Sequence, residues 1–445
     1  MNHRSMRNLS VAALSILLLG AVSGPVLALD LVFERTWGGP SLAGPTEEAE
    51  GVAVAPDGSI YVTGQTSSFG TGADDGDSDI FLIKYAPDGT IAWQRTYGVD
   101  RPDPLQPAND FGMDVEVAPD GSVWVTGELA ARVLLVQFDA SGNLLSERTF
   151  DGADSPRAMD IAPDGSIYVT GFEFPGAGQG DAFLMKCAPD GTLVWLKTWG
   201  AVNGFDIGFD VAAASDGSVY IAGDSNGFFG NGAFLLKVDA GGNVIWERTW
   251  RAGTIQDFSS GQGVAIGPDG NIYLTGSALI SGVGQNAFLV KFAPDGSVLW
   301  ERVWLERDST GATGIAVAPG GRIYITGGTS FGIEEADAFV VEFLPDGQVR
   351  RAATWGGAGA QFAQDLALAP DGSLYVAGGT TGPPPYKFRQ ASKKQGTPVS
   401  FLGTPTGTVT TPPGTATDPN GIVLVPNGSQ TYAGGTDAVL LKIVP

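Results

Sequence analysis

A repeat of about fifty residues constrains this chain more than any other feature of the sequence. Its first half reads Gly51-Val-Ala-Val-Ala-Pro-Asp-Gly-Ser-Ile-Tyr-Val-Thr-Gly64, and Ala-Pro-Asp-Gly or a close variant begins at residues 55, 118, 162, 214, 267, 318 and 369. Its second half, residues 79–97, is echoed by residues 181–199, 232–250, 286–304 and 337–355. Periods of this size are typical of propellers, solenoids and related arrays.

Each unit contains four short runs rich in Val, Ile, Tyr, Phe and Trp, separated by turn residues. This pattern predicts a four-stranded antiparallel meander, so we expect an all-β chain that forms a β-propeller. The Pro-Asp-Gly turns agree, because Pro fixes φ for a turn and Gly takes the positive φ that closes a hairpin. With 66 Gly and 28 Pro in 445 residues, a helical bundle is excluded.

The two ends of the repeat predict how the ring closes. Residues 31–37 read as a fourth strand without preceding partners, and residues 437–443 read as a third strand without a successor. We therefore expect the amino-terminal strand to complete the last blade, which removes an open sheet edge. Residues 421–435 resemble the first half of another unit, so eight blades are favoured and seven are possible; residues 382–418 are then a degenerate blade or an irregular insertion.

The amino terminus has the features of an export signal. Arg4 and Arg7 precede an apolar run over residues 11–20, and small residues end at Ala28. We expect residues 1–28 to be a signal peptide cleaved near Ala28, which leaves residues 29–445 as one propeller domain that is periplasmic or extracellular. No later stretch is apolar enough to predict a transmembrane span, and we expect a monomer.

Charge and composition exclude several classes of function. Without residues 1–28, 23 basic residues face 48 acidic ones, a net charge of −25, which excludes nucleic acid as a partner. The single His is at position 3 and the single Cys at 187, so the mature chain cannot contain a Ser-His-Asp triad or a histidine zinc site.

The repeat resembles the bacterial SBBP-type β-propeller family, whose units carry Pro-Asp-Gly, Tyr-Val-Thr-Gly, Asp-Ala-Phe-Leu-Val-Lys and Trp-x-Arg-Thr-Trp-Gly. The resemblance covers nearly the whole mature chain except residues 382–418. It implies a seven-bladed architecture, so the favoured count of eight departs from it, and it implies no catalytic residue.

The connections within and between blades predict which face of the disc carries function. All Pro-Asp-Gly turns join strand one to two or strand three to four, so they share one face. The other connections share the opposite face and vary in length and sequence, for example over residues 67–78, 98–110 and 172–180. Since functional residues sit most often on variable loops of a rigid scaffold, we expect any binding site on this loop face.

Two groups of acidic residues are candidate calcium ligands, because Ca²⁺ prefers oxygen donors. Asp114, Asp210 and Asp365 occupy one aligned position of the inner strands, where other units carry Gly or Ala. Their alternative role is hydrogen bonding to neighbouring backbone N–H groups. Asp75, Asp77 and Asp79 alternate like the start of a calcium loop, although Ile80 and Ala86 stand where such a loop needs Gly and Glu. A solvated acidic loop is the alternative.

A basic and aromatic patch, Tyr386, Lys387, Phe388 and Arg389, is a candidate ligand-binding segment in this acidic chain. A solvated excursion without a ligand is the alternative.

The function favoured by the sequence is that of an exported, non-enzymatic binding or scaffold protein. It would recognise a polysaccharide, a cell-envelope component or a protein through the loop face. The alternative is a carbohydrate-active hydrolase or lyase that uses loop carboxylates, since such chemistry needs no histidine. No cofactor is predicted apart from Ca²⁺, the cation proposed for the acidic groups.

Overall fold

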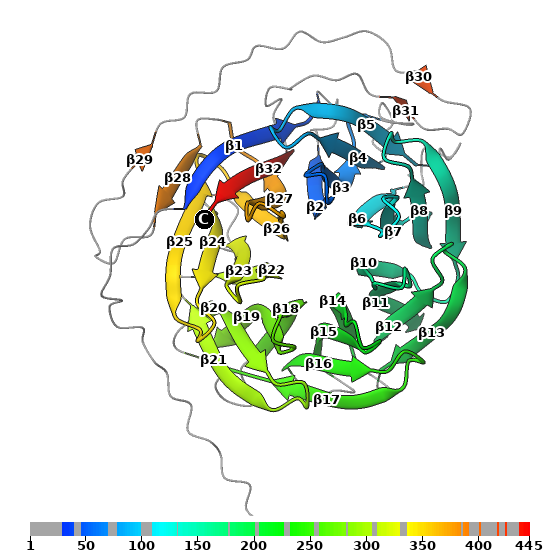
Figure 1. Ribbon diagram of the computed structural model, residues 1–445, viewed down its shortest axis with the longest axis vertical. Helices are drawn as coiled ribbons and strands as arrows, with labels where there is room; N and C mark the ends of the chain where they lie inside the picture. The colour runs from blue at the N-terminus through cyan, green and yellow to red at the C-terminus, as the bar shows by residue number, and fades with distance from the viewer. Residues whose placement is uncertain are drawn as a thin grey trace, which may run out of the picture.

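In the computed structural model the strands form seven antiparallel sheets arranged around one central axis (Figure 1). The described residues are 29–39, 46–69, 78–98, 109–130, 132–176, 179–200, 204–226, 232–252, 258–281, 284–304, 309–329, 336–383, 386–390, 400–401, 416–417, 423–424 and 436–445. No residue within these ranges is helical, and accordingly none of them forms a helix that could cross a membrane. The expected signal peptide, residues 1–28, lies outside them.

Each sheet is a blade of four strands, numbered here from the inner strand outward. Blade 1 is β2 (Glu47–Val54), β3 (Ile60–Thr66), β4 (Asp79–Tyr85) and β5 (Ile91–Tyr97). Blade 2 is β6 (Phe111–Val117), β7 (Val123–Glu128), β8 (Val133–Phe138) and β9 (Leu144–Phe150). Blade 3 is β10 (Ser155–Ile161), β11 (Ile167–Gly176), β12 (Gln179–Cys187) and β13 (Leu193–Trp199).

The remaining blades follow the same order. Blade 4 is β14 (Asp206–Ala213), β15 (Val219–Ser225), β16 (Gly232–Val238) and β17 (Val244–Trp250). Blade 5 is β18 (Phe258–Ile266), β19 (Ile272–Ile280), β20 (Gly284–Phe292) and β21 (Val298–Trp304). Blade 6 is β22 (Gly311–Val317), β23 (Ile323–Gly328), β24 (Ala338–Phe343) and β25 (Val349–Gly356). Blade 7 is β26 (Gln361–Leu368), β27 (Leu374–Thr380), β32 (Asp437–Val444) and β1 (Asp30–Trp37).

The composition of blade 7 confirms the predicted closure of the ring. Strand β1, from the amino-terminal end, pairs antiparallel with β32, which places Trp37 opposite Ala438. The first and last parts of the chain therefore share one sheet, and no inner strand is left without a neighbour.

The structure corrects the favoured count of eight blades to the alternative of seven. Residues 382–418 supply no outer strands for an eighth blade. Instead β28 (Lys387–Gln390) and β29 (Ser400–Phe401) extend blade 6 beyond β25, and β31 (Val423–Leu424) with β30 (Ala416–Thr417) extends blade 1 beyond β5. The segment that resembles a further unit thus pairs with an outer strand, because the chain after it offers only β32, which blade 7 needs.

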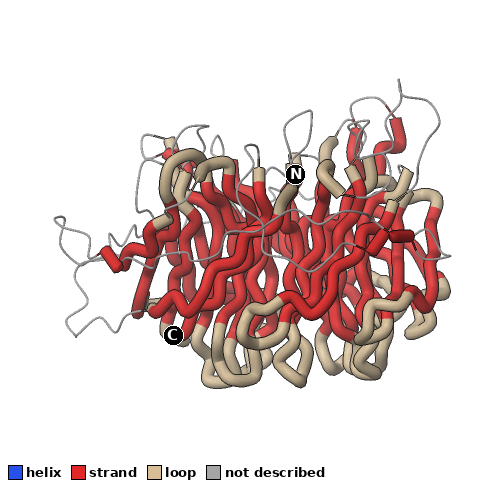
Figure 2. Tube along the Cα trace, turned by 90° about the horizontal axis from the view of Figure 1, so that it is seen from above, coloured by secondary structure: helices blue, strands red, loops and turns tan. Residues whose placement is uncertain are grey.

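The Pro-Asp-Gly segments close the hairpins as predicted, and they gather on one face of the disc (Figure 2). In the first, Gly58 has a φ of +84° and its N–H donates to Ala55 O over 2.9 Å. The carboxylate of Asp57 accepts from Ser59 N over 2.8 Å, which satisfies a further donor within the turn. Repetition of this turn builds a regular face, whereas the opposite, loop face carries the variable connections.

Adjacent blades are joined by an arginine of each outer strand. Arg95 Nε of blade 1 donates to Gly142 O of blade 2 over 3.0 Å, and its guanidinium lies 5.2 Å from the ring centre of Trp93. Arg35, Arg248 and Arg302 make the same contact with Gly89, Gly296 and Gly347. These contacts confirm that the Trp-x-Arg pattern is structural, with cation–π packing at the interface.

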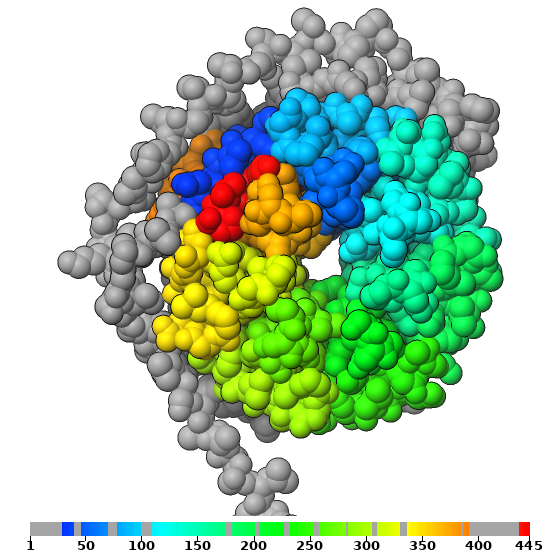
Figure 3. Space-filling model, viewed as in Figure 1, coloured from blue at the N-terminus to red at the C-terminus, as the bar shows by residue number. Residues whose placement is uncertain are grey.

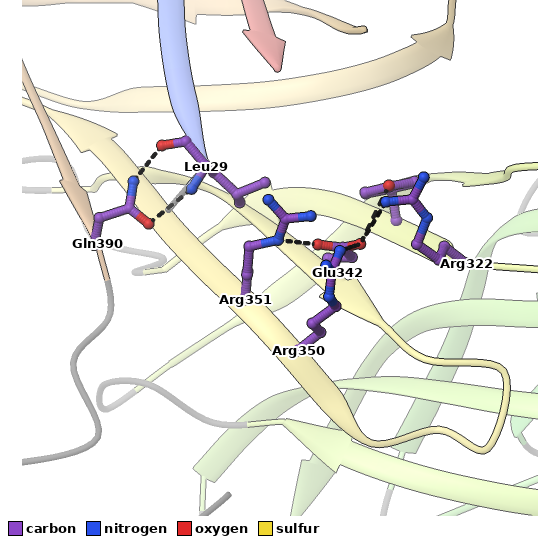
Figure 4. A network of polar contacts seen from close by, with 7 residues as sticks. Leu29, Arg322, Glu342, Arg350, Arg351 and Gln390 are labelled. Atoms are coloured by element: carbon purple, nitrogen blue, oxygen red, sulfur yellow. Dashed lines mark hydrogen bonds and ion pairs between the residues drawn. The ribbon is translucent and has the colours of Figure 1, made fainter. Parts of the chain in front are cut away.

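Blade 6 departs from this pattern at three positions. Glu342 stands where other third strands carry Lys, Arg351 where their partners carry Trp, and Ala353 where they carry the joining Arg. The fully buried Glu342 accepts from Arg350 over 2.8 Å and from Arg351 and Arg322, so three guanidinium groups compensate one carboxylate (Figure 4).

Candidate functional site

Each innermost strand contains a β-bulge close to its loop-face end. In β2 the pairing shifts between Ala49 and Gly51, and the other six inner strands shift at the aligned place. The bulged residues are Glu50, Met113, Arg157, Phe209, Gln262, Thr313 and Gln364. Bulges re-aim side chains. Since the inner strands surround the central opening (Figure 3), these positions decide what surrounds the loop-face end of the channel.

The three aligned aspartates of the inner strands tie neighbouring blades together. Asp114 Oδ2 accepts from Met159 N over 2.8 Å, Asp210 Oδ2 from Val264 N over 2.7 Å, and Asp365 Oδ2 from Val52 N over 2.9 Å. In each aspartate the other oxygen accepts from the backbone N–H of the next residue. Asp160 does the same for blades 3 and 4 through Ala213 N.

Burial raises the pKa of these carboxyl groups. It brings the pKa of Asp210 to about 7 and that of Asp365 and of Asp160 to about 6, although the backbone N–H groups oppose the shift. The pKa of Asp114 is raised well above its usual range, first by burial and then by the negative charge of Asp365. The aspartates therefore repel one another across the channel.

The predicted calcium ligands are distributed differently. Asp114, Asp210 and Asp365 belong to blades 2, 4 and 7, and each already accepts two backbone N–H groups. Within the described ranges, no three Asp, Glu, His or Cys side chains are arranged to hold one metal ion. Asp75 and Asp77 lie outside the described residues, whereas Asp79 is buried at the start of β4, beside Gly98 and Asp110. Calcium binding by these residues stays a prediction.

The predicted ligand-binding patch lies on the outer rim and not on the loops. Tyr386 packs on Trp355, with ring centres 4.7 Å apart, and its hydroxyl donates to Gly382 O over 2.6 Å. Phe388 packs against the core between blades 6 and 7, and Arg389 lies 3.5 Å from the carboxylate of Asp337. Lys387 is exposed. A ligand role for the patch is untested, and three of its four side chains contact the blades.

Four charged residues, Glu48, Glu50, Glu128 and Arg157, form what we call the channel mouth. Burial, together with the negative charge of Glu48, raises the pKa of Glu50 to about 8, and Arg157 opposes this shift. Burial also raises the pKa of Glu48, which accepts from Gln65 Nε2 over 3.1 Å, and the pKa of Glu128. Arg157 therefore lies among acids that hold their protons unusually well.

Three phenylalanines beside the channel mouth form an aromatic cluster. Phe172 and Phe174 lie at the loop-face end of β11, with ring centres 5.0 Å apart, and Phe205 from the next blade lies 5.8 and 6.1 Å from them. The guanidinium of Arg157 is 5.3 Å from the ring centre of Phe172, which links the cluster to the channel mouth.

Local hydrogen bonds fix the backbone of this cluster. Asp154 accepts from Phe174 N over 2.8 Å, and Asn226 accepts from Phe205 N over 2.7 Å. The side chain of Phe174 is nevertheless 53% exposed, although Phe172 below it is buried. A large apolar ring held in solvent by a fixed backbone is unusual for a soluble surface and indicates a contact site.

Sequence reasoning identified the loop face but missed this aromatic cluster. The signal was present at the end of β11, where Phe172 and Phe174 replace the polar residues of the aligned segment Gln65-Thr-Ser67. Phe205 comes from the following blade, so its place beside them depends on blade packing and could not be obtained from spacing alone.

Comparison with known proteins supports the fold. A family model described as a domain of unknown function (DUF5122) beta-propeller matches residues 55–91. A search of curated proteins finds no significant match. Many solved structures are similar, among them a protein of unknown function from Bacteroides caccae, with 15% identity and a TM-score of 0.38, covering 61% of this chain and 93% of that one.

Two further similar structures come from proteins with different printed descriptions. The Pan2 WD40 domain of Neurospora crassa is 12% identical with a TM-score of 0.42, over 75% of this chain and 86% of that one. A PL25 ulvan lyase bound to -[GlcA(1-4)Rha3S]- is 8% identical with a TM-score of 0.43, over 79% and 93%. These values support a propeller but neither an activity nor the SBBP-type family specifically. The chain is thus a seven-bladed β-propeller, similar over residues 55–91 to the DUF5122 beta-propeller family.

Proposed function

We propose that this chain is an exported, monomeric binding protein without enzymatic activity that recognises a polysaccharide of the cell envelope or surroundings through its loop face. The observation that carries the proposal is the exposed ring of Phe174, held beside Phe172, Phe205 and the charged channel mouth. Ligand sites combine aromatic surface with a few placed polar groups, and this arrangement offers both. An envelope protein is the other class of ligand that such a surface fits.

The propeller scaffold supports this role physically. Inter-blade hydrogen bonds and a buried core at each blade junction hold the inner strands in place, for example Tyr220, Trp250, Leu274 and Phe288 between blades 4 and 5. A rigid surface loses little conformational entropy when it binds, and so retains more of the contact energy.

The channel mouth supports one alternative, a carbohydrate-active hydrolase or lyase. A carboxyl group with a pKa of about 8, as for Glu50, is protonated at neutral pH, and Glu48 lies beside it. Such a group could act as a general acid. Binding without turnover and binding with turnover therefore need to be separated in one assay.

The experiment incubates the mature protein, residues 29–445, with insoluble polysaccharides and cell-envelope fractions, and records both sedimented protein and released soluble sugar. Binding that is lost in Phe174→Ala and kept in Leu145→Ala supports the proposal, because Leu145 is equally exposed, at 54%, on the outer rim of blade 2. Sugar release that disappears in Glu50→Gln would instead establish the enzyme. Sedimentation equally strong in Phe174→Ala would contradict the assigned site.

A further inference from the structure

Two acidic residues are completely buried at the junction where the ring closes. Glu47 begins β2 of blade 1 and is 0% exposed, and Asp437 begins β32 of blade 7 and is 1% exposed. The neighbouring chains are joined here by a hydrogen bond of 2.8 Å from Glu47 N to Thr436 O. Both acids therefore lie between the first blade and the last.

One oxygen of each acid has no hydrogen-bond partner. Glu47 Oε1 accepts from Thr66 Oγ1 and from Ser68 N, each over 3.1 Å, but Glu47 Oε2 and Asp437 Oδ1 accept from no group. Both orphaned oxygens border Gly38: a Cβ placed on this glycine would lie 3.0 Å from Glu47 Oε2 and still closer to Asp437 Oδ1. The two oxygens thus converge on one buried point.

The same two positions are neutral or compensated at other junctions. Between blades 5 and 6 they are Asn286 and Thr310. Between blades 6 and 7 they are Asp337 and Gln361, and Arg389 lies 3.5 Å from the Asp337 carboxylate.

Two further junctions carry two acids, but these acids have partners: Asp110 accepts from Ala130 N over 2.9 Å, and Asp206 accepts from Ser225 Oγ. By contrast, neither Glu47 nor Asp437 forms an ion pair with a Lys or Arg of the described ranges.

Two buried carboxylates cannot both remain ionised side by side without a compensating charge. We propose that Glu47 and Asp437 bind a hard divalent cation, of which Ca²⁺ is the expected one, at the junction of blades 1 and 7. Ca²⁺ takes oxygen ligands from carboxylates, backbone carbonyls and water, so the two carboxylates supply the charged part of its shell. Neither residue belongs to the acidic groups that the sequence suggested as calcium ligands.

Binding at this place would strengthen the closure of the ring. The cation would hold the start of β2 to the start of β32, next to the end of β1. A ligand that binds the folded state alone stabilises it in proportion to the logarithm of its concentration. The cation would therefore act on the junction at which the two ends of the chain meet.

Terbium luminescence tests the site directly, because Trp37 directly precedes Gly38 and is buried, and an indole close to Tb³⁺ sensitises its emission. The mature protein is stripped with EDTA, titrated with Tb³⁺ and then with Ca²⁺, and its melting temperature is measured with each. The double variant Glu47→Gln/Asp437→Asn removes both charges, and Asp337→Asn is the matched control at another junction.

The expected result is sensitised emission from one bound ion, displaced by Ca²⁺, with a rise of several degrees in melting temperature. Both effects should vanish in the double variant and persist in Asp337→Asn. Emission that persists in the double variant would place the ion elsewhere and overturn the proposal. Absence of any metal effect, together with a double variant more stable than the wild type, would show instead that the two acids share a proton.

Discussion

The carboxylate of Asp365 in blade 7 accepts a hydrogen bond of 2.9 Å from the backbone N–H of Val52 in blade 1. This contact joins the inner strands at the two ends of the repeat. Together with the pairing of β1 and β32, it makes the ring continuous on its inner and outer sides.

Removal of such an inter-blade contact should lower stability. We expect Asp365→Ala to reduce the free energy of unfolding by about 1–3 kcal/mol, because two buried backbone N–H groups lose their acceptor. Asp365→Asn keeps one side-chain acceptor oxygen and should cost less. Urea unfolding monitored by tryptophan fluorescence measures both. Equal stability of the alanine variant and the wild type would show that water replaces the carboxylate.

The stability of the protein should be greatest in mildly acidic solution. Burial raises the folded-state pKa of Asp210 to about 7 and of Asp365 and Asp160 to about 6. These groups therefore favour folding below the unfolded pKa near 4, and this contribution is lost as the pH rises through 6 and 7.

The turn aspartates oppose this trend at low pH. The N–H and hydroxyl groups of following serines lower the pKa of Asp57, Asp120 and Asp216. Their stabilisation is present above the unfolded pKa and is lost as the pH falls through the folded value. Calorimetry from pH 3 to 9 should thus give a maximum in melting temperature between about pH 4 and 6. A melting temperature that rises from pH 5 to 8 would contradict the assignment, and Asp210→Asn should flatten the decline.

Sequence reasoning obtained the blade, its turns, the closure by the amino-terminal strand and the functional face, since each depends on local patterns that repeat. It favoured the wrong blade number because residues 421–435 match a unit in pattern, and only the pairing of β31 with β5 shows otherwise. It also could not bring Phe205 to Phe174, or Glu47 to Asp437. Those neighbours come from different blades, and their approach is set by packing around the axis.

The charge exchange in blade 6 predicts a compensating pair of substitutions. Glu342→Lys alone should destabilise by about 3 kcal/mol, because it leaves three guanidinium groups beside a fourth buried cation. Glu342→Lys/Arg351→Trp recreates the pair found in blade 5, where Lys291 lies opposite Trp300, and should recover part of the loss. A double-mutant cycle in urea measures this coupling. A double variant no more stable than Glu342→Lys would mean that the two positions are independent.

Gln390 of β28 should protect the start of β1. Its side chain accepts from Leu29 N over 3.1 Å and donates to Leu29 O, and Leu29 is fully buried (Figure 4). We expect Gln390→Ala to destabilise by about 1–2 kcal/mol and to accelerate hydrogen exchange in β1. Lys387→Ala, on the same strand but exposed, is the control and should leave exchange unchanged. Unaltered exchange in Gln390→Ala would show that β1 is held by β32 alone.

The measurement that tests the proposed function most directly is the equilibrium affinity of the mature protein for an insoluble polysaccharide that sediments it, determined for the wild type, Phe174→Ala and Leu145→Ala. If the aromatic cluster is the contact site, Phe174→Ala should weaken binding at least tenfold, which corresponds to about 1.4 kcal/mol, whereas Leu145→Ala should bind like the wild type. Unchanged affinity of Phe174→Ala, or release of soluble sugar by the wild type, would contradict a recognition module that binds through the loop face.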